Sequence, residues 1–133
     1  MDVYGLQKIG KTMIIQELKN ELLAAENILN TEYSFEKAEP NYCRCLEIIY
    51  GAPESKSQFV DLMTSLFESN QVSDEPLAFL MHSLRWPEIR AWAENKLRQM
   101  PNPIATGRPL EKLIEAFNED WENQQFYELF TKE

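Results

Sequence analysis

The sequence predicts an all-α protein in which residues 1–133 form a single domain, a short irregular stack of antiparallel helix hairpins with six to seven helices. Apolar residues recur every three or four positions over most of the chain, which is the spacing of one helix face. No stretch alternates convincingly with the period of two that a β-strand shows, and the seven prolines fall near expected helix ends. Because the connections are short, consecutive helices are expected to pack antiparallel.

The first three helices are predicted from their apolar stripes. The first covers residues 11–29, the second covers 41–50 and stops at Gly51, and the third covers 54–69. Pro40 precedes the second helix and suits a first turn, where a backbone N–H is not needed. The inward positions are Ile14, Leu18, Leu22, Ala25, Leu29, Leu46, Ile49, Tyr50, Phe59, Leu62, Met63, Leu66 and Phe67.

The later helices are predicted in the same way. Asp74 is expected to cap a fourth helix, the fifth covers 87–100, and the sixth runs from Pro109 to at least Trp121. A last aromatic helix is expected to follow. The apolar residues of the fourth and last helices are Leu77, Leu80, Met81 and Leu84, and Phe126, Tyr127, Leu129 and Phe130.

The segment 77–97, LAFLMHSLRWPEIRAWAENKL, carries a regular pattern. One apolar helix face is followed by a turn and then by Pro87-Glu88-Ile89-Arg90, which opens a second helix. The second helix repeats its apolar positions at i, i+4 and i+8, and the small Ala93 would let the two helices approach closely. This pattern resembles a HEAT repeat, an antiparallel helix pair whose second helix begins with a proline, an acidic residue, an aliphatic residue and an arginine.

A fainter copy of the pattern lies upstream. Pro53-Glu54 precedes Pro87-Glu88 by 34 residues, within the usual period of helical repeats. The resemblance implies that the motif packs helices and performs no reaction, and that the protein works by presenting a surface. A plain helical bundle is the alternative architecture.

The charge of the chain restricts its partners. The formal net charge is −9, which argues against nucleic acid and against an anionic membrane surface as partners. A basic protein partner suits it, because opposite potentials speed encounter, although many acidic proteins carry their charge for solubility alone. The chain has no run of 18 apolar residues and no secretory signal at its start, so a cytoplasmic location is expected.

Residues that perform chemistry are scarce. His82 is the only histidine and lies among core positions, so a structural role is expected rather than that of a ligand or base. Cys43 and Cys45 are spaced i, i+2, which makes a poor disulfide and a poor metal pair, so buried or half-buried thiols are expected. The chain is therefore expected to be no enzyme and to need no cofactor or metal. An enzyme that uses His82 or a carboxylate pair is the least favoured hypothesis.

One set of carboxylates is ordered. On a helix that starts at Leu110, four glutamates fall on the side opposite the apolar stripe, and residues 111–133 hold seven acidic and two basic residues. This face is either simply solvated or a docking strip for a basic partner. If the helix continued, the aromatic tail would emerge on the acidic side, so a break near Asn123 that folds the tail onto the core is favoured. The candidate partner-binding residues are Glu111, Glu115, Glu119, Asp120, Glu122 and Phe126.

Small, acidic, helical chains without catalytic groups resemble the immunity proteins of bacterial toxin systems, including contact-dependent inhibition. The resemblance implies that the chain binds and blocks a cognate basic toxin, and the negative charge favours a nuclease. The alternative is a helical-repeat adaptor that binds a peptide or a protein subunit in an apolar groove. Salt would weaken the first kind of complex and leave the second largely intact.

Overall fold

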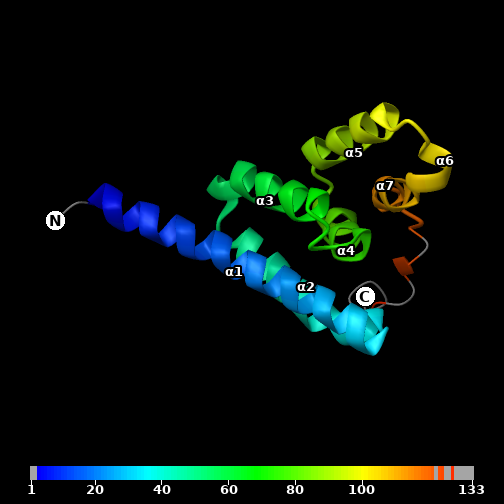
Figure 1. Cartoon of the computed structure of the whole chain (residues 1–133). Coiled ribbons are helices and arrows are strands. Elements are labelled where there is room, and N and C mark those ends of the chain that lie inside the picture. Colours follow the sequence, from blue (N-terminus) through cyan, green and yellow to red (C-terminus); the bar gives the residue numbers. More distant parts are fainter. Residues whose placement is uncertain (1–2, 122, 125–126, 128–133) are drawn as a thin grey trace.

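The computed structural model describes residues 3–121, 123–124 and 127, and side chains from Met13 onward. Within these residues the chain forms seven α-helices and no strand, with 3-10 turns at Pro53–Ser55 and at residues 123–124, which confirms the predicted all-α fold (Figure 1). The elements are α1 Val3–Glu32, α2 Phe35–Tyr50, η1 Pro53–Ser55, α3 Lys56–Glu68, α4 Asp74–Leu84, α5 Pro87–Gln99, α6 Pro103–Thr106 and α7 Arg108–Glu115.

Helices α1 and α2 form an antiparallel hairpin along one side of the molecule (Figure 1). Tyr33, with φ of 54°, and Ser34 join them. The Ser34 hydroxyl accepts a hydrogen bond from the backbone N–H of Lys37 at 3.3 Å and so caps α2. Both helices begin earlier than predicted, and α1 also ends later. The apolar stripe identifies the middle of a helix, but helix ends are harder to predict from sequence.

Pro40 lies inside α2 and not at its start, so the prediction that all prolines mark helix ends is wrong there. The chain gives up one backbone hydrogen bond at this position. The Ser34 cap and the apolar face that α2 packs against its neighbours outweigh that loss. The buried apolar residues of this face are Ala38, Tyr42, Cys45, Leu46 and Ile49.

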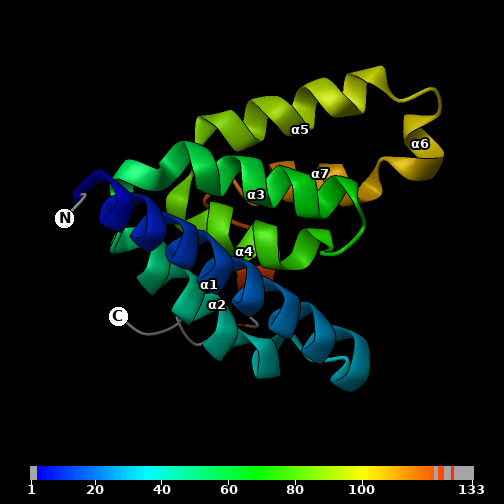
Figure 2. The same ribbon diagram turned by 60° about the vertical axis from the view of Figure 1, so that its left-hand side comes forward.

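The remaining helices follow one another across the molecule. Helices α3 and α4 lie in the middle, and α5, α6 and α7 lie on the side away from the α1–α2 hairpin, as the turned view in Figure 2 also shows. Helix α7 packs against both α4 and α5, whereas α4 and α5 make few direct contacts with each other. Ala93 is fully buried on α5, but the main helix partner of α5 is α7 and not α4. The HEAT-like relation of α4 and α5 therefore stays a prediction.

The hydrophobic core contains residues from all the longer helices. Its largest fully buried side chains include Leu18 and Leu22 from α1, Tyr42 from α2 and Phe59 from α3. Cys45 is buried and Cys43 is half-buried, which confirms the burial expected of the two thiols. Over residues 3–121, no helix is long and apolar enough to cross a membrane.

Helix α7 ends at Glu115, so the prediction of a helix that continues to Trp121 is wrong. Two side chains of the α4 region explain the early end. His82 Nδ1 donates a hydrogen bond to the carbonyl of Ala116 at 2.8 Å, and the Arg85 guanidinium donates to the carbonyl of Phe117. In a longer helix, the carbonyls of Ala116 and Phe117 would accept hydrogen bonds from backbone N–H groups four residues later; here they accept from the two side chains instead. His82 is buried and has the structural role expected of it.

The chain after α7 turns back onto the core. Trp121 is 5% exposed and Tyr127 is fully buried, so the described part of the tail packs inward, as expected. The turn comes earlier than the predicted break near Asn123, and Tyr127 is not helical. Of the predicted aromatic helix, Phe126, Leu129 and Phe130 lie outside the described residues.

Candidate functional site

The predicted acidic strip is split by the end of α7. Glu111 and Glu115 lie on α7, and both pair with Arg108 at its first turn. The Arg108 guanidinium is 3.6 Å from the Glu111 carboxylate and 3.3 Å from that of Glu115. The prediction of one continuous acidic helix face is therefore wrong, and two of its carboxylates already have a cationic partner.

Glu119 and Asp120 lie in the turn after α7, and both are exposed. Neither side chain makes a hydrogen bond or an ion pair with another residue of the described chain. Among the predicted partner-binding residues that the structure describes, these two are exposed and have no hydrogen-bond or ion-pair partner within the described chain. Glu122 and Phe126 lie outside the described residues.

Charge is unevenly distributed along this part of the chain. Residues 85–112 hold six basic and three acidic residues, whereas residues 113–133 hold six acidic and one basic residue. The sign of the charge therefore changes within α7. The negative end is the segment that contains Glu119 and Asp120.

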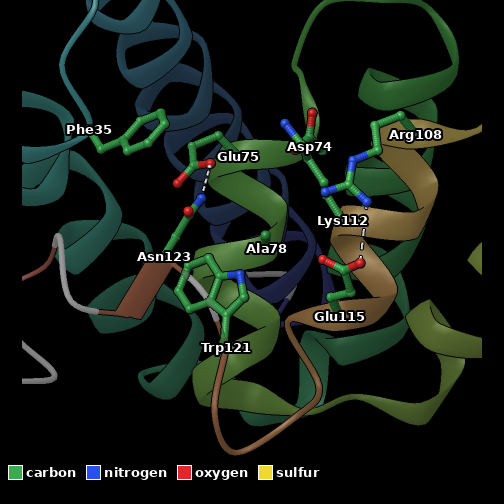
Figure 3. A pocket seen from close by; sticks show the side chains of 9 residues that line it. All are labelled: Phe35, Asp74, Glu75, Ala78, Arg108, Lys112, Glu115, Trp121 and Asn123. Carbon is green, nitrogen blue, oxygen red and sulfur yellow. Dashed lines mark hydrogen bonds and ion pairs between the residues drawn. The ribbon is translucent and has the colours of Figure 1, made fainter.

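A cavity of about 270 Å³ adjoins this segment. Helix α4 contributes Ala78 and two carboxylates, α7 contributes residues from one side, and the chain after α7 contributes residues from the other side (Figure 3). The lining residues are Phe35, Asp74, Glu75, Ala78, Arg108, Lys112, Glu115, Trp121 and Asn123. Three carboxylates and two cations thus face one small space.

Glu75 is a buried carboxylate, 6% exposed, in the first turn of α4. It accepts a hydrogen bond from the Asn123 side-chain amide at 3.0 Å and a second one from the Tyr127 hydroxyl. Burial raises the pKa of Glu75, and the bond from Tyr127 offsets part of this effect by stabilising the charged form. Both donors belong to the chain after α7, so this carboxylate joins that segment to α4.

Asp74 precedes Glu75 in the chain. The prediction that Asp74 caps α4 is wrong, because the cap position is Ser73. The Ser73 backbone N–H and hydroxyl both donate to the Glu26 carboxylate, at 3.0 and 2.8 Å. This pair of bonds ties the start of α4 to α1. Asp74 is thereby left half-buried at the cavity, and burial raises the pKa of its carboxyl group.

An aromatic cluster supports the cavity from the side of the tail. Tyr127 packs on Phe79 and Trp121, with ring centroids 4.8 and 5.8 Å away, and stacks on Phe35 at 6.4 Å. The Trp121 ring also lies 5.0 Å from the His82 ring. Residues from α2, α4 and the tail therefore hold the Trp121 side of the cavity in place.

Most residues of the cavity carry no signal in the sequence that marks them as a site. Phe35, Asp74 and Arg108 lie far apart in the chain, and Asp74-Glu75 reads as a helix start, where acidic residues are common. The two adjacent acids before Pro76 are a possible sign of a binding site, but the same pattern is also typical of the start of a helix.

In the part of the chain with described side chains, no group of three or more His, Cys, Asp or Glu residues could hold a metal ion. Comparison of the chain with known protein families, with curated proteins and with solved structures finds no match.

Proposed function

We propose that the protein is an acidic inhibitor that binds and blocks a cognate basic toxin in the cytoplasm, as immunity proteins do. The observation that carries the proposal is the exposed pair Glu119 and Asp120, which make no hydrogen bond or ion pair within the described chain. Such carboxylates are available to a cationic surface without first breaking an internal bond. The charge of a nucleic-acid-cleaving toxin fits best, since its substrate is also anionic.

The surroundings of the pair support the same function. Six acidic residues against one basic residue in 113–133 make this segment strongly negative, and such a field speeds association with a cationic partner. Glu119 and Asp120 directly precede Trp121, which is anchored in the aromatic cluster. A rigid base beneath the charged pair reduces the conformational entropy lost on binding.

Charge reversal tests the proposal. The double variant Glu119→Lys with Asp120→Lys is compared with a control that reverses Glu54 and Asp61, two exposed acids on η1 and α3. Both variants change the net charge equally. Proteins captured from the native host at low and at high salt are identified by mass spectrometry.

The expected capture is a basic protein that wild type and control bind at low salt and that the Glu119/Asp120 variant loses. The association rate of this complex should fall by about tenfold or more in the variant, and should fall steeply with salt in the wild type. A partner that binds the variant at the wild-type rate, or that ignores ionic strength, would contradict the proposal.

A helical-repeat adaptor is the second candidate, and one observation favours it. Ile104 on α6 is 96% exposed, and every residue from Pro101 to Thr106 is exposed. Exposed apolar side chains of this kind would contribute contacts to a bound peptide or protein subunit with little dependence on salt. Capture that persists in high salt and disappears in Ile104→Ser would favour the adaptor over the toxin inhibitor.

A further inference from the structure

We propose that the cavity between α4, α7 and the chain after α7 receives one basic side chain, an arginine or a lysine, from the partner protein. The inference rests on the proposed function, because it assigns a recognition pocket to the same acidic region. A cavity of about 270 Å³ is smaller than a typical small-molecule site of about 300–1,000 Å³ and suits a single side chain.

The balance of charge in the lining favours a cation. Asp74, Glu75 and Glu115 contribute three carboxylates, and Arg108 and Lys112 contribute two cations. Arg108 is already engaged, because its guanidinium pairs with Glu111 and Glu115. Arg108 and Lys112 both act on Asp74, but three carboxylates against two cations leave one negative charge of the lining uncompensated.

Asp74 is the group that a cation would meet first. Its carboxylate is half-buried and forms no ion pair within 4 Å in the described chain. Figure 3 shows it at the cavity beside Lys112, whose charge acts to lower the pKa of Asp74. Burial nevertheless dominates and raises the pKa, which means that its charged form lacks solvation that an incoming guanidinium would supply.

The rest of the lining suits the stem of such a side chain. Phe35 and Trp121 contribute aromatic carbon to the lining, and Ala78 contributes a methyl group (Figure 3). Arginine and lysine pack their methylene stems against apolar surface while the charged head finds a polar partner. Arginine anchors in desolvated pockets also contribute much of the affinity of many protein interfaces.

The test titrates the isolated protein with N-acetyl-arginine amide and follows the amide signals of Asp74 and Ala78 and the indole signal of Trp121 by NMR. The matched probe is N-acetyl-citrulline amide, which has the same shape without the charge. We expect saturable shifts with the arginine probe and about tenfold weaker binding of the citrulline probe. The lysine analogue should bind at the same signals.

Two variants give opposite results if the inference is right. Asp74→Asn should weaken binding of the arginine probe by about tenfold, whereas Lys112→Gln should strengthen it several-fold by removing a repulsive charge. Asp61→Asn, an exposed acid on α3, is the control and should leave binding unchanged. Lys112 is exposed, so its variant tests the pocket even if Asp74→Asn does not fold.

Equal shifts with both probes, no saturation with the arginine probe, or saturation with inorganic phosphate in its place would overturn the inference. These titrations use the protein alone, so their failure leaves the charge-dependent capture of a partner standing. Conversely, a partner that binds the Glu119/Asp120 variant at the wild-type rate would overturn the proposed function and leave the titration result unaltered. The two proposals can thus fail separately.

Discussion

The Tyr127 hydroxyl donates a hydrogen bond to the Glu75 carboxylate, and this contact joins the end of the described chain to the first turn of α4. Both groups are buried, at 0% and 6% exposure, so neither can exchange its partner for bulk water without opening the structure. Asn123 donates to the other carboxylate oxygen. This buried carboxylate therefore helps to hold the segment that carries Glu119 and Asp120, together with the donors His82 and Arg85.

Tyr127→Phe removes one donor and leaves part of a buried carboxylate without a partner. The free energy of unfolding should fall by about 1–3 kcal/mol, measured by urea denaturation at neutral pH. Tyr50→Phe is the control, because Tyr50 is 62% exposed. Equal stability of wild type and Tyr127→Phe would mean that the bond contributes nothing.

Stability should depend on pH through Glu75. Its pKa is raised above the ordinary value of 4.5, mainly by burial, so the folded state binds the proton more tightly than the unfolded state does. The stabilising effect of this proton is complete below about pH 4.5 and is lost as pH rises through the folded-state pKa. Wild type should therefore gain stability relative to Glu75→Gln as pH falls from 7 to 4.5.

Urea denaturation of both proteins at several pH values in that range measures the difference. Comparison with Glu75→Gln removes the contributions of other groups, including the raised pKa of Asp74, if those groups titrate alike in the two proteins. A difference that stays constant across the range would show that Glu75 titrates as it does in the unfolded chain.

His82→Ala should loosen the turn after α7. The variant leaves the Ala116 carbonyl without its donor and removes a ring that lies 5.0 Å from that of Trp121. A loss of about 1–3 kcal/mol is expected, with faster amide hydrogen exchange from residue 116 to 118. Ser83→Ala, at the next position of α4, should change neither quantity; exchange that is unaltered in His82→Ala would argue that the imidazole does not hold the turn.

Gly107→Ala should also destabilise the protein. A Cβ atom at Gly107 would lie 2.5 Å from the Pro103 carbonyl oxygen and 2.5 Å from a Leu97 methyl group, and the carbonyl is backbone that cannot move cheaply. At Gly51 the nearest atom would be 3.3 Å away, so Gly51→Ala should cost less. Thermal unfolding of the two variants, with an expected loss of about 1–3 kcal/mol for Gly107→Ala, checks the order.

The presence of the helices could be predicted well from the sequence, but the residues at which they end could not. The fifth helix was predicted almost to the residue, because Pro87 opens it and Pro101 follows it. Helix α7 was predicted too long, since its periodic pattern continues past Glu115 and only donors from the α4 region stop it. Periodicity reports which face is apolar, but it does not report a tertiary hydrogen bond to the last carbonyls.

Some features of the candidate site could likewise be predicted from the sequence, and others could not. Glu119 and Asp120 lie exposed in the negative segment that the sequence indicates, but in the turn after α7 and not on the helix that was predicted. The pairing of Glu115 with Arg108 was missed, because the two residues lie seven positions apart, beyond the spacings usually considered for helix pairs. The cavity could not be predicted, since Phe35, Asp74 and Asn123 meet only after three separate segments have packed.

The donors that stop α7 precede the carbonyls they bind by 34 and 32 positions, and they belong to a different helix and its cap. The residues that determine where the backbone turns are therefore far in the sequence from Glu119 and Asp120, which the turn carries. A substitution at position 82 or 85 could redirect Glu119 and Asp120 while leaving both side chains intact. The direction in which these two carboxylates point can therefore change through residues of α4 and its cap, without any change at positions 119 and 120.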